Sequence, residues 1–121
     1  MNEATALSQV RLELARRQWP AWRNNVGVLM DAKGRPVRYG LANDSKQVNS
    51  MVKSGDLIGV RPVVITPDMV GQTIGQFASW EIKRPGWKYN PHDQHEVAQL
   101  RWQQIVVAAG GYALFTTGEF I

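Results

Sequence analysis

The apolar pattern near the start of the chain predicts a helix over residues 3–18. Three apolar residues recur at helical spacing, and a proline then ends the pattern: Leu7, Val10, Leu14 and Pro20. Glu3 stands four residues before the first of them, so its carboxylate falls on the apolar stripe and would point toward the core. The alternative is a frayed first turn, where a carboxylate is favourable near the positive end of the helix dipole.

Shorter patterns follow this helix. Residues 22–39 predict two extended segments joined as a hairpin by the loop from Asp31 to Gly34. Residues 41–54 are mainly polar and predict a loop with about one helical turn.

The second half of the chain alternates between strand and helix patterns. Four short strands are predicted, over residues 55–60, 62–66, 77–83 and 112–116. A second helix is predicted over 92–109, where Ala98, Trp102, Ile105 and Ala109 form one stripe, and Gly110 with Gly111 ends it. This order of elements predicts an α/β or α+β layer fold with a mixed sheet.

Length and composition narrow the class of protein. A chain of 121 residues with 44% hydrophobic residues predicts one domain over 1–121. No apolar run approaches the roughly 20 residues of a membrane span, and the first residues do not resemble a secretion signal, so a cytoplasmic protein is expected. The absence of cysteine excludes disulfides, thiolate nucleophiles and cysteine-based zinc sites, and any catalytic metal must rest mainly on oxygen ligands.

The balance of charge favours a polyanionic partner. Fourteen Lys and Arg against ten Asp and Glu give a formal net charge of +4. Cations that contact phosphates release condensed counterions, so this balance suits nucleic acid, although many basic proteins bind none.

One constellation of charged residues carries candidate chemistry. Glu81 and Lys83 stand two apart on the predicted strand 77–83, so both side chains project to the same side. If the strand that carries Asp56 pairs with this one, Asp56 and Glu81 could hold one divalent cation, with Lys83 beside it to orient water or neutralise phosphate. The main-chain carbonyl of Ile82 and waters would complete the shell. The alternative is a solvated strand face with a cross-strand ion pair.

Several longer stretches resemble the VRR-NUC family of nucleases. They run in order over nearly the whole chain: Arg23 to Gly27, Gly34 to Leu41, Ser54 to Gly59, Glu81 to Lys83, Gln99 to Trp102, and Gly110 with Gly111. The chain is most similar to the stand-alone type found in phages and prophages, which implies a bacterial host cytoplasm. The resemblance implies the αβββαβ core of the PD-(D/E)xK superfamily, with a mixed central sheet flanked by helices.

The resemblance also implies roles for particular residues. Glu3 matches the acidic residue of the first helix, which would contact the metal through water. Asp56 and Glu81 match the metal-binding carboxylates, Lys83 the catalytic lysine and Gln99 the glutamine of the second helix. The implied cofactor is Mg²⁺ or Mn²⁺. The chain departs from the family in having Gly55 where serine is commoner, and a longer insert between Lys83 and Gln99.

Stand-alone members act as homodimers on branched DNA, including four-way (Holliday) junctions. The resemblance therefore implies a structure-selective endonuclease that hydrolyses phosphodiester bonds. Two symmetric incisions across a junction also call for two active sites related by a twofold axis.

Basic residues outside the constellation are candidate DNA contacts. They are Arg23, Arg35 and Arg38 on the hairpin, and Arg84 and Lys88 after the catalytic strand. Trp87 and Tyr89 interleave with the latter two, and this segment could equally be a rim that packs on the core or on a partner subunit. His92 and His95 are expected to be solvated rather than metal ligands.

Two other functions remain open at this point. The chain could be a non-catalytic nucleic-acid-binding subunit that keeps the nuclease fold, or a structural dimer whose charged strand face is incidental. Pure binding has no use for carboxylates clustered near phosphates, and the joint presence of Asp56, Glu81 and Lys83 therefore argues against the first.

Overall fold

The computed structural model describes residues 2–118, and the chain divides into two compact units. One unit is residues 21–58, and the other combines residues 1–20 with residues 59–121. The elements in chain order are α1 (Glu3–Arg16), β1 (Ala21–Arg23), β2 (Gly27–Met30), β3 (Pro36–Tyr39), α2 (Lys46–Met51), β4 (Leu57–Gly59), a 3₁₀ turn η1 (Pro67–Met69), β5 (Ala78–Ile82), α3 (Gln94–Ala108) and β6 (Tyr112–Thr116).

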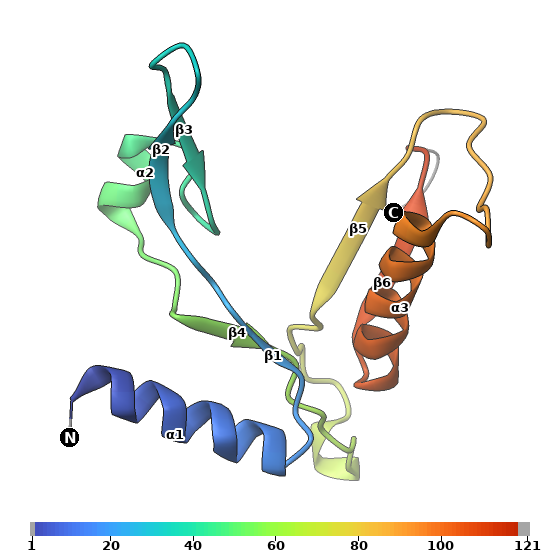
Figure 1. The fold of residues 1–121 in the computed structure, drawn as a ribbon. Helices are drawn as coiled ribbons and strands as arrows, with labels where there is room; N and C mark the ends of the chain where they lie inside the picture. Colours follow the sequence, from blue (N-terminus) through green and yellow to red (C-terminus); the bar gives the residue numbers. More distant parts are fainter. Residues whose placement is uncertain (1, 119–121) are drawn as a thin grey trace. The chain divides into compact units, whose positions relative to one another are not determined.

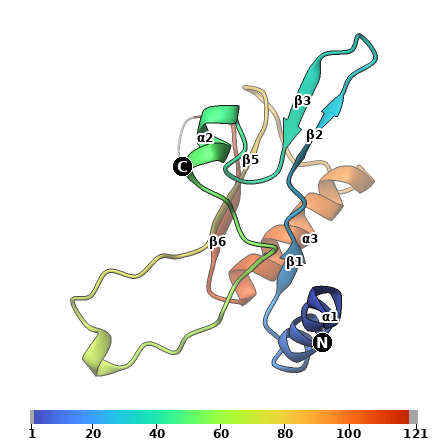
Figure 2. The same cartoon turned by 90° about the vertical axis from the view of Figure 1, so that its left-hand side faces the viewer.

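In the first unit, β2 and β3 form the predicted antiparallel hairpin (Figure 2). Asp31 begins the connecting loop, where its carboxylate accepts hydrogen bonds from the amides of Lys33 and Arg35. Gly34 has φ +76, a conformation that favours glycine, and its amide donates to the Asp31 carbonyl. Local turn chemistry therefore explains why this hairpin could be predicted.

A buried amide holds the base of the hairpin. Asn43 is 2% exposed, and its Nδ2 donates to the carbonyls of Gly27 and Tyr39, one from each strand. Its Oδ1 accepts from Nη2 of Arg38 at 2.7 Å. Asn43 thus connects the two strands at the open end of the hairpin.

The segment between β4 and β5 lacks the strand predicted over residues 62–66. It runs as an extended connection with η1 as its short turn (Figure 2). Val64 and Ile65 are 85% and 70% exposed, so their side chains are not packed as those of a buried strand would be. Pro62 and Pro67 bracket the segment and offer no amide for a strand ladder, so its apolar pattern alone was misleading.

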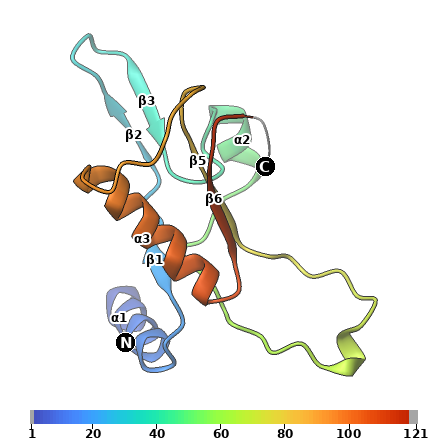
Figure 3. The ribbon, with the colours of Figure 1, turned by 90° about the vertical axis from the view of Figure 1, so that its right-hand side faces the viewer.

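In the second unit, β5 and β6 are parallel neighbours joined through α3, which packs against both strands (Figures 1 and 3). Asp93 caps α3 by accepting from the amides of His95 and Glu96. Gly110, with φ +93, follows the helix end, as predicted. A side chain at Gly111 would lie 2.6 Å from Val106 Cγ1, so this glycine permits the close return of the chain into β6.

The face of α3 that meets the sheet differs from the predicted stripe. Val106 is fully buried, Gln103 is 7% exposed, and Trp102 donates from Nε1 to Ser79 Oγ of β5. Ile105 is instead 47% exposed. The prediction followed apolar residues alone, whereas the face that packs on the sheet includes two glutamines, Gln99 and Gln103.

The helix α1 begins where predicted and ends two residues earlier. Asn2 caps it by accepting from the Thr5 amide at 2.8 Å. Glu3 is exposed in the first turn, and no described residue of α1 is buried. The prediction that its carboxylate points into a core is wrong, because the first turn of α1 leaves it in solvent.

The described chain is of mixed α/β type, as predicted, with three α-helices and small sheets. Its strands pair as β1 with β4, β2 with β3, and β5 with β6, instead of joining the expected single mixed sheet. One physical reason is that the segment between β4 and β5 carries prolines and adds no strand that could link the pairs. Within residues 2–118, no helix combines the length and apolar character of a membrane span.

Candidate active site

Three polar side chains of the second unit form a hydrogen-bonded row. Gln99 of α3 donates from Nε2 to Glu81 Oε1 at 2.7 Å, and its Oε1 accepts from Lys83 Nζ at 2.8 Å. Lys83 Nζ and Glu81 Oε1 are 4.0 Å apart. The carboxylate and the amine therefore lie on the same side of the strand, as the two-residue spacing predicts, and one amide connects them.

The fold positions each member of this row through its own element. Glu81 lies within β5, paired in register with Phe115 of β6. Lys83 follows β5 by one residue, and its amide continues the ladder by donating to the carbonyl of the buried Thr116 at 2.8 Å. Gln99 reaches them from the face of α3 that packs on the sheet.

The two charged side chains differ in their solvent exposure. The Glu81 side chain is 41% exposed, whereas that of Lys83 is 15% exposed. Within the described part of the chain, Glu81 Oε2 has no hydrogen-bond partner, so one carboxylate oxygen is available to a ligand. The site thus presents a free carboxylate oxygen beside a shielded cation.

Aromatic rings provide that shielding. Lys83 Nζ is 5.5 Å from the ring centroid of Trp87 and 5.7 Å from that of Phe115. Trp87 was already a candidate from its mixture with cations, but Phe115 was not identified from the sequence. The missing signal is the register of β5 and β6, which aligns Phe115 with Glu81 and which periodicity cannot supply.

Asp56 belongs to the first unit, where it directly precedes β4. Its side chain is exposed, and no hydrogen bond or ion pair within residues 2–118 engages its carboxylate. Its main-chain carbonyl accepts from the Asn24 amide at 2.9 Å. The backbone at Asp56 is therefore held while its carboxylate stays available.

Asn24 and Ser54 brace the segment that carries Asp56. Asn24 Nδ2 donates to Ser54 Oγ at 2.7 Å and to the Gly55 carbonyl at 2.9 Å. Ser54 Oγ in turn donates to the Leu41 carbonyl at 2.8 Å. Both residues lie in the stretches that carry the family resemblance, and the structure gives them a positioning role that the sequence alone did not.

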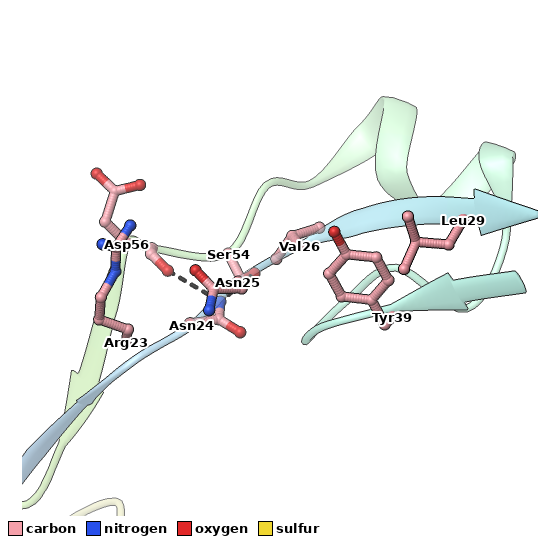
Figure 4. Close-up of a pocket in the computed structure, with 9 residues that line it drawn as sticks. Arg23, Asn24, Asn25, Val26, Leu29, Tyr39, Ser54 and Asp56 are labelled. Atoms are coloured by element: carbon pink, nitrogen blue, oxygen red, sulfur yellow. Dashed lines mark hydrogen bonds between the residues drawn. The ribbon is translucent and has the colours of Figure 1, made fainter.

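Asp56 also lines an open pocket of about 630 Å³ within the first unit. Its polar and apolar lining residues are Arg23, Asn24, Asn25, Val26, Leu29, Tyr39, Ser54, Gly55 and Asp56. In Figure 4 the Asp56 carboxylate lies at the end of this pocket away from Tyr39. A cation, an anionic carboxylate and an aromatic ring therefore border one space.

The candidate DNA-contacting cations differ in whether other groups of the protein already engage them. Arg23, Arg84 and Lys88 are exposed. Arg35 is 69% exposed but pairs with Asp31 at 2.9 Å. Arg38 is half-buried and donates from Nε and Nη2 to Asn43, so its guanidinium stabilises the hairpin base.

The donor chemistry of these residues suits a hard divalent cation. Carboxylate and carbonyl oxygens are the ligands that Mg²⁺ prefers, and it is commonly held by one or two carboxylates while keeping several waters. Within the described residues, no group of three or more His, Asp or Glu side chains gathers to hold a metal. The Glu81 carboxylate, with its Oε2 unengaged by other described residues, is one oxygen donor of this kind.

Comparison with known proteins finds no relative of this chain. No protein-family pattern, no curated protein and no solved structure matches the chain significantly.

Proposed function

We propose that the chain is a metal-dependent DNA endonuclease that hydrolyses phosphodiester bonds. The observation that carries the proposal is the row formed by Glu81, Gln99 and Lys83, with its carboxylate and amine on one side of β5. An accidental ion pair on a solvated strand face needs no glutamine bonded to both groups. Such a glutamine suits a reaction site, because it keeps both charges in a fixed direction while substrate binds.

Each residue of the row has a defined task in this proposal. Glu81 and Asp56 would hold Mg²⁺ or Mn²⁺, together with the main-chain carbonyl of Ile82. Such an ion offsets charge on the phosphate and lowers the pKa of its water. Lys83 would direct an N–H toward the attacked phosphate or the water, while Gln99 keeps Lys83 and Glu81 apart and oriented.

The family and core fold are part of the same proposal. The parallel β5 and β6, with α3 between them in the chain, support the later half of a PD-(D/E)xK core. Glu81, Lys83 and Gln99 occupy the positions in which the VRR-NUC resemblance places its catalytic groups. Assignment to that family rests on these residues and on the sequence motifs.

We propose branched DNA, such as a four-way junction, as the substrate and a homodimer as the active form. The net charge of +4 favours a polyanion, and the exposed Arg23, Arg84 and Lys88 are available for phosphate contacts. A chain with one site needs a twofold partner to make two symmetric cuts.

The test is cleavage of labelled four-way junction, flap and linear duplex DNA, with Mg²⁺, with Mn²⁺ and with chelator. We expect metal-dependent cleavage, with the junction cut faster than the duplex. Lys83→Ala should lower the rate by at least about 100-fold and retain DNA binding, because the amine acts on the reacting phosphate.

Lys33→Ala is the matched control for Lys83→Ala, since Lys33 is exposed in the hairpin loop. It should cut like the wild type. Binding without cleavage by the wild type under every metal condition would instead identify a non-catalytic binding module. Normal cleavage by Lys83→Ala would remove the amine from the mechanism.

A further inference from the structure

We propose that Trp87 and Phe115 are positioning residues for Lys83, whose ammonium group they hold against Gln99 as an aromatic wall. The inference rests on the proposed nuclease function and assigns a task to the loop that follows β5. Neither ring touches the reacting phosphate in this account; both act through the amine.

The geometry of the wall is specific. Lys83 Nζ lies 5.5 Å from the Trp87 ring centroid and 5.7 Å from that of Phe115, within the range at which a cation is attracted to a ring face. The two rings pack on each other at 4.7 Å between centroids, and Tyr89 extends the cluster at 6.0 Å from Phe115. The ammonium group therefore faces a continuous aromatic surface.

The lysine needs this wall because its other restraints are few. The lysine side chain is a flexible chain of four methylene groups, and a single hydrogen bond, to Gln99 Oε1, fixes its amine. Glu81 Oε1, at 4.0 Å, is beyond hydrogen-bond distance. The rings block rotamers that would swing the amine into solvent, and the remaining N–H groups keep their direction.

The loop after β5 is built to deliver Trp87. Gly86 has φ +83, and the Trp87 amide donates to the Arg84 carbonyl at 3.1 Å, which closes a tight turn. This turn folds the chain back so that Trp87 reaches the amine four residues before it.

The placement of Lys83 is testable without any substrate. Of the five lysines in the chain, only Lys83 should show ε-methylene protons shifted upfield by ring currents in a ¹H–¹³C spectrum, assigned with Lys83→Arg. Trp87→Leu should abolish most of this shift, and Trp87→Phe should keep much of it. Trp80→Leu is the matched control, because Trp80 lies in β5 on the side opposite Glu81 and contacts Tyr112.

Cleavage kinetics on the four-way junction test the consequence. Trp87→Leu should lower kcat by about tenfold with KM unchanged, the size expected for loss of a partly desolvated cation–π contact. Trp87→Phe should restore most of kcat, whereas Trp80→Leu should leave it at the wild-type value.

The possible outcomes test the positioning role of Trp87 and the nuclease function separately. An unchanged Lys83 shift, or unchanged kcat, in Trp87→Leu overturns the positioning role. Equal loss of kcat in Trp87→Leu and Trp87→Phe, with both folded, also overturns it, because any ring should serve. A wild-type protein that shows the upfield shift but cleaves no DNA supports the aromatic placement and overturns the nuclease function instead.

Discussion

Two amide side chains, Gln99 and Asn43, connect groups that the backbone leaves apart. An amide both donates and accepts, so Gln99 can accept from a lysine while donating to a carboxylate. Asn43 similarly donates to two carbonyls while accepting from Arg38. Neither an ionised carboxylate nor an ammonium group offers both functions, and these two positions should tolerate few replacements.

Asn43→Ala tests this idea where no catalysis is involved. It would leave the carbonyls of Gly27 and Tyr39 without their buried donor and should lower the free energy of unfolding by about 2–4 kcal/mol. Chemical denaturation measures the change, with Gln47→Ala as the control because Gln47 is exposed in α2 of the same unit. Equal stability of the two variants would contradict the role given to Asn43.

Whether the placement of a side chain could be predicted depends on how far apart in the sequence its contact partners lie. The same-side placement of Glu81 and Lys83 followed from strand periodicity, which is local. The contact of Lys83 with Phe115 required strand register, and the bond of Gln99 to both charges required the docking of α3. The engagement of Arg38 by Asn43 likewise depends on a loop conformation that its polar composition does not encode.

At the scale of elements, strong local signals succeeded and weak ones failed. The hairpin turn, the end of α3 at Gly110 and the strand β6 were predicted closely because turn and cap chemistry act within a few residues. The strand expected over 62–66 did not form, because an apolar run becomes a strand only where a neighbouring strand can hydrogen-bond with it. The face of α3 was misjudged because glutamines, rather than apolar residues, cover part of the sheet.

The hairpin loop should carry a pH dependence of its own. The Arg35 amide donates to the Asp31 carboxylate and lowers its pKa; burial opposes this, while the Arg35 side chain and the Lys33 amide add to the lowering. A carboxyl whose native pKa is lowered stabilises the fold above its unfolded pKa of about 3.9. This contribution is lost as the pH falls through the lower native value.

Asp31→Asn should therefore lower the thermal midpoint near neutral pH, and the difference from the wild type should shrink as the pH falls below about 4. Thermal unfolding followed by circular dichroism from pH 7 to pH 2.5 measures both curves. Asp44→Asn, exposed and outside the hairpin, is the control. A constant difference across the range would show that Asp31 acts without its charge.

For the molecule as a whole, the proposed function assigns roles to residues of both compact units. Glu81, Lys83 and Gln99 belong to one, and Asp56 with its braces Asn24 and Ser54 belongs to the other. Composition could predict a basic protein, because charge is summed over the chain, and the order of helix and strand patterns could predict the mixed α/β type. Measurements on the intact protein test the proposed joint action of Asp56 and Glu81.

The proposed homodimer can be tested by its mass in solution. Sedimentation velocity at micromolar concentration should give a species of twice the 13.6 kDa chain mass, and junction cleavage should fall as dilution dissociates it. Full junction cleavage by a protein that sediments only as a monomer would rule out the paired-site arrangement.

Electron paramagnetic resonance titration of the intact protein with Mn²⁺, without DNA, tests whether Asp56 and Glu81 together hold a metal ion. We expect one bound ion per chain, and an affinity reduced by more than about 100-fold in both Asp56→Asn and Glu81→Gln, because each removes a ligand. Glu13→Gln, which alters a carboxylate paired with Arg16 and Arg17 on α1, should bind as the wild type does. Undiminished Mn²⁺ affinity in either Asp56→Asn or Glu81→Gln would contradict a metal centre built from these two carboxylates.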